Sequence, residues 1–219
     1  MRYRFYRVHK YVCFELSEFD RQAAKTDFLN NDACEALKEK WVLLANLLKH
    51  HAEYEDDYIH DLLRQKKSQS QSILEKDHQQ HELDANTLLN KLEQIALIQV
   101  PSQRILLGHD FYLAYRLFYS EMLKHLYEEE KTLLPQIQAL YTDAELAKLQ
   151  AKTYQKMTPE QMLGMLNVLF PHANPEDMYF FANEMKAAEP EKFEMVWKML
   201  AQDYKQLIIS HSQHHLADA

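Results

Sequence analysis

The chain of 219 residues is long enough to bury a sizeable hydrophobic core without disulfides or other cross-links. Only two glycines leave few positions for tight hairpins, and the abundant helix-forming residues predict an all-α fold. A net charge of -8 argues against a nucleic-acid partner, because sequence-independent binding to phosphates requires clustered lysine and arginine.

Cysteine content and hydropathy predict a cytoplasmic protein. Cys13 and Cys34 are too few for a disulfide framework, and no CxxC or Cys/His zinc spacing is present. The N-terminal stretch MRYRFYRVHKYVCFEL is basic but lacks a small-residue cleavage site. No apolar run approaches the length needed to span a bilayer, so no membrane partner is expected.

Apolar residues at helical spacing predict four long helices in residues 1–137. These cover roughly residues 3–24, 31–66, 72–98 and 102–134. The second carries the apolar stripe Trp41, Leu44, Leu48, Ile59 and Leu62. We therefore predict an up-down four-helix bundle over residues 1–137.

Residues 138–219 contain their own helix-start signals and are predicted to form a helical extension packed on the bundle. Thr142 precedes Asp143 and Glu145, and Thr158-Pro159-Glu160-Gln161 has the sequence of a capping box. Asn174-Pro175 repeats the pattern of a cap followed by proline. Glu189-Pro190 is predicted to begin the last helix, which would continue through Leu207.

Each of the four predicted long helices places a histidine on its apolar face, and two of them add a glutamate four residues later. The resulting candidate metal ligands are His9, His51, Glu55, His78, His125 and Glu129. His81, Glu82 and Glu121 lie close to these faces and are additional candidates. His50, His60 and His109 are expected at the surface or its boundary.

Histidine and glutamate on a core face require a partner, because burying an unpaired carboxylate costs several kcal/mol or forces it to take up a proton. A metal ion is the simplest partner. A set of more than four ligands, mixed in imidazole and carboxylate and without thiolate, suits two iron ions better than a structural zinc. Manganese and zinc remain alternatives.

The order and spacing of these residues resemble the hemerythrin-like (HHE cation-binding) family over roughly residues 1–137. The matching segments are Tyr6-Arg7-Val8-His9-Lys10, His51-Ala52-Glu53-Tyr54-Glu55-Asp56, Asp77-His78, and His125-Leu126-Tyr127-Glu128-Glu129-Glu130 followed by Leu133-Leu134-Pro135. The resemblance implies that His9, His51, His78 and His125 are terminal iron ligands. It also implies that Glu55 and Glu129 bridge the two irons.

The chain departs from the oxygen-carrying members of that family at two places. Those members have HxxxH on the third helix, where this chain has Glu82 four residues after His78, with His81 one position earlier. On the fourth helix they have HxxxxD, where this chain has HxxxE, with Glu130 at the longer offset. More carboxylate and less histidine favour peroxide or nitric oxide chemistry, oxygen reduction, or iron or redox sensing over reversible O2 carriage.

Two alternatives remain open on the sequence. A ferritin-like di-iron oxidase would use ExxH motifs, of which Glu75-Lys76-Asp77-His78 is the only one in the four helices. A helical interaction module without a redox role would contact a partner protein, or a second copy of the chain, through the Met-rich C-terminal helices. Ala85, close to His81 in projection, is small enough to leave space for a ligand.

Overall fold

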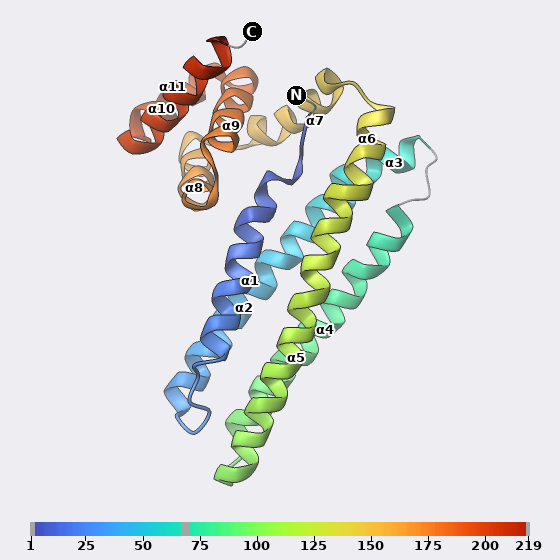
Figure 1. Ribbon diagram of the computed structural model, residues 1–219, viewed down its shortest axis with the longest axis vertical. Helices are drawn as coiled ribbons and strands as arrows, with labels where there is room; N and C mark the ends of the chain where they lie inside the picture. Colours follow the sequence, from blue (N-terminus) through green and yellow to red (C-terminus); the bar gives the residue numbers. More distant parts are fainter. Residues whose placement is uncertain (1–2, 67–70, 218–219) are drawn as a thin grey trace. The chain divides into compact units, whose positions relative to one another are not determined.

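The computed structural model (Figure 1) describes residues 3–66 and 71–217, with the side chains of 71–75 and 214–217 outside the description. The described residues are helical and contain no strand, which confirms the all-α class. The chain divides into two compact units. The larger unit is Val12–Ile137, and the smaller unit joins Met1–Tyr11 to Gln138–Ala219.

Four long helices make up most of the larger unit: α1 (His9–Ala23), whose first three residues belong to the smaller unit, α2 (Asn31–Tyr54), α4 (Gln71–Leu97) and α5 (Pro101–Glu128). Short helices α3 (His60–Gln65) and α6 (Leu134–Leu140) follow α2 and α5. The Asn30 side chain caps α2 by accepting a hydrogen bond from the N–H of Ala33. The fourth predicted helix starts one residue early, because Pro101 occupies the first helical position, where no N–H is needed.

One hydrophobic core joins the four long helices, and the predicted stripe of α2 lies in it. Trp41 is fully buried and contacts Phe19 of α1 and Phe118 of α5, with ring centroids 5.1 and 5.5 Å away. Its indole N–H donates to the carbonyl of Ala85 in α4 at 3.2 Å. The Tyr115 hydroxyl donates to the carbonyl of Leu16 at 2.5 Å. Buried aromatic rings with satisfied polar atoms hold the helices at fixed positions.

Two π-helical turns interrupt the long helices, at Glu55–Ile59 after α2 and at Glu129–Leu133 after α5. Each turn begins at a glutamate that the sequence identified as a candidate ligand. A π turn holds one more residue than an α turn and rotates the residues that follow it. The surface position predicted for His60 is therefore wrong, and its side chain is fully buried.

Gly108 in α5 allows close packing of the segment that precedes α2. A Cβ atom at Gly108 would lie 2.3 Å from Cγ of Phe28, whereas a Cβ atom at Gly164 in α8 (Pro159–Leu169) would meet nothing within 4 Å. We expect Gly108→Ala to destabilise the larger unit by about 1–3 kcal/mol through overpacking. The control Gly164→Ala is expected to stabilise its helix by roughly 0.5–1 kcal/mol.

Urea denaturation, monitored by tryptophan fluorescence, measures the free energy of unfolding of both glycine variants. Each unit contains a tryptophan, because Trp41 lies in the larger unit and Trp197 in the smaller unit. A Gly108→Ala protein as stable as the wild type would show that Phe28 moves aside without cost.

The helices of the smaller unit are α7 (Asp143–Lys156), α8, α9 (Pro175–Ala188), α10 (Pro190–Met199) and α11 (Gln202–Ala217). Capping boxes at Thr142 and Thr158, and the Asn174 cap, are confirmed by their hydrogen bonds. The prediction of one last helix through Leu207 is wrong. Leu200 adopts an extended conformation between α10 and α11, which buries its side chain in the core.

The methionines of residues 157–199 serve mainly as core residues. Met162, Met178 and Met185 are buried, in a core that also contains Phe170, Phe193 and Val196. Met195 and Met199 are about half exposed. Packing of flexible thioether side chains against aromatic rings explains most of this stretch.

Residues 3–11 complete the smaller unit through a buried ion network. The Arg7 guanidinium pairs with Asp177 at 3.6 Å and with Glu184 at 3.1 Å, and it stacks over Phe180. Lys10 also pairs with Asp177. Burial raises the pKa of Glu184, and the charge of Arg7 lowers it in opposition. Arg7 therefore stabilises two buried carboxylates.

Among the described residues, no helix combines the length and apolar character that crossing a membrane requires.

Candidate metal centre

The structure brings four of the candidate ligands together in the larger unit: Glu55, His78, His125 and Glu129. All four side chains are buried, and each offers one ligand atom within 4.8 Å of the others. His78 Nε2 lies 2.9 Å from His125 Nε2 and 3.5 Å from Glu55 Oε2. His125 Nε2 lies 3.4 Å from Glu129 Oε1. The nitrogen and oxygen atoms of three long helical segments therefore converge on one point.

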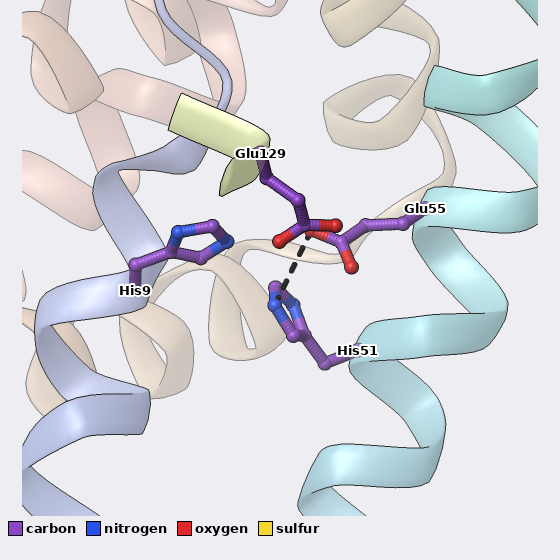
Figure 2. Close-up of side chains that lie close together, drawn as sticks. All are labelled: His9, His51, Glu55 and Glu129. Carbon is purple, nitrogen blue, oxygen red and sulfur yellow. Dashed lines mark ion pairs between the residues drawn. The ribbon is translucent and has the colours of Figure 1, made fainter. Parts of the chain in front are cut away.

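A second group shares both carboxylates with the first. It consists of His9, His51, Glu55 and Glu129, whose ligand atoms also lie within 4.8 Å of one another (Figure 2). His51 Nε2 is 3.3 Å from Glu55 Oε1. Figure 2 shows the His51 ring and the two carboxylate groups directed toward a common centre. All six principal candidates from the sequence thus belong to one of these two groups.

The separations fit a bound first-row metal ion. Such an ion holds nitrogen and oxygen ligands at about 2.0–2.2 Å, so ligand atoms at right angles stand about 3 Å apart and opposite ones about 4.2 Å apart. The measured separations among Glu55, His78, His125 and Glu129 run from 2.9 to 3.8 Å. Imidazole nitrogen with carboxylate oxygen is a donor set that iron, manganese and zinc all accept.

The electrostatics of the cluster favour positive charge beside its two buried carboxylates. Glu55 and Glu129 are 1% and 0% exposed, which is costly for two neighbouring carboxylates. Burial alone lowers the pKa of His78, but hydrogen bonds to Glu129 and Glu55 and the charges of Glu55 and Asp56 outweigh it and raise that pKa to about 10. In the metal-free chain, a proton on His78 therefore takes the place of a cation.

Two further side chains, which the sequence analysis missed, support His78. Asp56 Oδ1 lies 3.0 Å from His78 Nδ1 and 2.8 Å from His60 Nδ1. The His60 ring stacks on His78 with centroids 5.4 Å apart. Asp77 lies near His125 without a hydrogen bond, with Oδ2 3.7 Å from His125 Nδ1. Carboxylates at the outer nitrogen of an imidazole fix the tautomer that presents Nε2 to a metal.

A sequence signal for these positions exists in retrospect. Asp56 directly follows Glu55, Asp77 directly precedes His78, and His60 lies four residues after Asp56. Asp56, His60 and His78 also form a third group with ligand atoms within 4.8 Å. Because His78 turns Nδ1 toward Asp56 and Nε2 toward Glu55, we assign Asp56 and His60 to supporting roles.

The three additional candidates lie outside the groups found among the described residues. Glu82 is exposed and pairs with Lys49 at 3.2 Å, and Glu121 is exposed on α5. His81 lies beside the cluster, its ring centroid 5.0 Å from that of His125. Burial and the charge of His125 lower the pKa of His81 to about 4, so its imidazole is neutral at physiological pH.

A cavity of about 320 Å³ adjoins the cluster in the larger unit. His51, Glu55, His78 and His125 form part of its lining. Several other lining residues, including Asn46, Gln79 and Asn86, are exposed, so the cavity has access to solvent. Ala85 contributes to the wall, as expected for a small residue that leaves ligand space.

Comparison of the chain with protein-family models, with curated proteins and with solved structures gives no match.

Replacing Asp56 tests whether its carboxylate orients His78 for metal binding. We expect Asp56→Asn to lower metal affinity about 10- to 100-fold, because the amide no longer holds the Nδ1–H tautomer of His78. Asp57→Asn is the matched control, since Asp57 is adjacent but exposed. Competition with a chromophoric chelator measures both affinities. Equal affinities in the two variants would remove Asp56 from the site.

The metal-free protein is expected to lose stability as pH rises from about 6.5 through about 10. The pKa of His78 is higher in the folded state than its ordinary 6.5, so its contribution is fully present below pH 6.5 and disappears as the folded state deprotonates. Urea denaturation at a series of pH values measures this loss. His78→Gln is expected to show a smaller loss over the same range, and an unchanged slope would contradict the assignment.

Proposed function

We propose that this chain holds a dinuclear non-haem iron centre and uses it to bind or sense a small ligand, namely O2, nitric oxide or peroxide, or the iron and redox state itself. The observation that carries the proposal is that two groups of four ligand-type side chains share the buried carboxylates Glu55 and Glu129. A carboxylate has two oxygen atoms, so a shared glutamate can contact two ions. Two groups with two shared members favour two ions over one.

We further propose that the larger unit, begun by the first turn of α1, is an up-down four-helix bundle of the hemerythrin type. In support, the ligand-type residues occur along the chain in the order expected from that resemblance, one set on each long helical segment: His9, then His51 with Glu55, then His78, then His125 with Glu129. The fold proposal also accounts for the shared core of α1, α2, α4 and α5.

Iron is the proposed metal because the donors are imidazole and carboxylate with no thiolate. Neither free cysteine belongs to the groups found among the described residues. A pair of irons would supply one-electron redox steps and a Lewis-acidic position for a small ligand. The protein side chains would hold that pair, with Glu55 and Glu129 placed between the two sets of imidazoles.

The remaining residues control the surroundings of the site. Phe118, Leu48 and Met122 form an apolar part of the lining of the adjoining cavity. Asp56 orients the imidazole of His78 through the hydrogen bond at Nδ1. The proton on His78 is released when metal binds, so metal uptake would liberate acid.

Metal analysis tests the proposal on protein purified without an affinity tag. We expect about two irons per chain, ultraviolet and visible absorption of a ferric pair that bleaches on reduction, and higher thermal stability with iron than without. Folded protein that contains no iron, and takes none up when ferrous iron is added anaerobically, would overturn the proposal. Tight binding of one zinc ion would overturn the dinuclear part.

A further inference from the structure

The cavity beside the cluster is much larger than a diatomic ligand requires. Its volume of about 320 Å³ lies at the lower end of the range for small-molecule pockets, whereas one water occupies about 30 Å³ of liquid. Because α2, α4 and α5 all contribute side chains, the cavity is built by the core of the larger unit. Part of this volume lies against the ligand-type residues His51, Glu55, His78 and His125, and the part beside Leu89 and Phe118 leaves room for a small organic ligand.

The inner wall of the cavity is apolar. Its apolar side chains are Trp41, Leu48, Ala85, Leu89, Phe118 and Met122. The one polar atom of the Trp41 indole is already satisfied, because its N–H donates to the carbonyl of Ala85. The Trp41 and Phe118 rings stand at 81° to each other, with centroids 5.5 Å apart, and both are fixed in the core. Such a wall favours an aromatic or aliphatic body.

His81 supplies a polar contact point in this lining. Neither ring nitrogen of His81 has a hydrogen-bond partner within the described part of the chain; Nδ1 is closed off by burial, so Nε2 is the nitrogen that a ligand can reach. The ring is held edge-on against His125 and against Phe118, at interplanar angles of 84° and 82°. A ligand hydroxyl group can hydrogen-bond to Nε2 in either tautomer of His81, since a hydroxyl both donates and accepts.

Four acidic side chains line the cavity; Glu53 is exposed to solvent, and the other three lie beside basic side chains of the protein. Glu82 pairs with Lys49, and Asp56 contacts both His60 and His78. Glu55 faces His51 and His78. An anionic or cationic ligand would therefore bring an uncompensated charge to an apolar wall, so a neutral ligand is favoured.

We propose that this cavity binds a small neutral organic molecule with an apolar body and one hydroxyl group, of which phenol is the simplest aromatic example. The hydroxyl group hydrogen-bonds to Nε2 of His81, and the ring lies against Leu89 and Phe118. This inference goes beyond the proposed metal function and does not depend on it, because the residues that form the contacts are present with or without metal.

Calorimetric titration with phenol and with toluene, which replaces the hydroxyl by a methyl group of similar size, tests the proposal. The protein is used as purified and again after iron removal, with folding checked by circular dichroism. We expect phenol to bind about two- to tenfold more tightly than toluene. His81→Leu should abolish that preference and leave toluene affinity undiminished. Benzoate, which adds a negative charge, should bind more weakly than phenol.

A pair of variants on the same helix locates the site. Ala85→Phe fills the cavity and should abolish binding of both probes, whereas Ala96→Phe, at an exposed position of α4, should leave both affinities unchanged. Absence of phenol binding to folded wild-type protein would overturn the inference, as would full binding by Ala85→Phe or a hydroxyl preference that survives in His81→Leu. These outcomes are separate from metal content, which is measured on the same samples.

Discussion

Replacement of Glu129 by glutamine is expected to reduce bound iron from about two ions per chain to less than one. Glu129 is fully buried and belongs to both groups of ligand-type side chains. A neutral amide has only one oxygen atom, so it can neither contact two ions nor supply negative charge. Loss of this one residue therefore affects both ions, unlike loss of a histidine that belongs to one group.

The matched control for this experiment is Glu128→Gln. Glu128 precedes Glu129 on the chain, is partly exposed, and lies 4.0 Å from Lys124. We expect this variant to retain the iron content of the wild type. Iron content is measured by elemental analysis after anaerobic loading, and Glu55→Gln should behave as Glu129→Gln does.

Stability measurements separate loss of metal from loss of fold. In metal-free protein, Glu129→Gln removes one of two neighbouring buried carboxylates, so its free energy of unfolding should equal or exceed that of the wild type. The gain in stability on adding iron should be smaller in the variant. Full iron content in Glu129→Gln would show that this carboxylate is not shared between ions.

Replacement of Arg7 by alanine is expected to destabilise the smaller unit by about 3–5 kcal/mol. The Asp177 side chain is 8% exposed and that of Glu184 is 14% exposed. Without the guanidinium, burial would raise the pKa of Glu184 further, so the penalty should be largest at neutral pH and smaller in acid. Tyr3 and Tyr154 hydrogen-bond Glu184 but carry no compensating charge.

Hydrogen exchange of the α9 amides measures this effect, with α5 amides as an internal reference for the larger unit. Arg4→Ala is the matched control, because Arg4 is exposed and three residues away. Adding Asp177→Asn and Glu184→Gln to Arg7→Ala should restore part of the protection, since no buried charge is then left unpaired. Unchanged α9 exchange in Arg7→Ala would contradict the role of the ion network.

The helical class and the ligand-type residues could be predicted because both depend on local periodicity. An advance of about 100° per residue places His51 and Glu55 on the face of Leu48, and the structure buries Glu55 there. That same periodicity failed at His60, because the π turn at Glu55–Ile59 adds a residue that no side chain announces. Asp56 was missed because its role depends on contact with His78 of another helix.

The remaining features could not be predicted because they depend on contacts between residues far apart in the sequence. Nothing in the sequence links Arg7 to Asp177 and Glu184, which lie far along the chain and become its partners only in the fold. The end of α10 was missed for a related reason. Leu200 leaves the helix to fill the core, and no proline or glycine marks the position.

Because the smaller unit combines residues 1–11 with residues 138–219, it can assemble only late in protein synthesis. Arg7 and its partner Glu184 are 177 positions apart in sequence. At about 5–20 residues per second, the ribosome adds the second partner roughly 10–35 seconds after the first. Residues 12–137 of the larger unit are contiguous and complete before then. The larger unit can therefore fold during translation, whereas Arg7 stays without its partners Asp177 and Glu184 until the C-terminal helices have been synthesised.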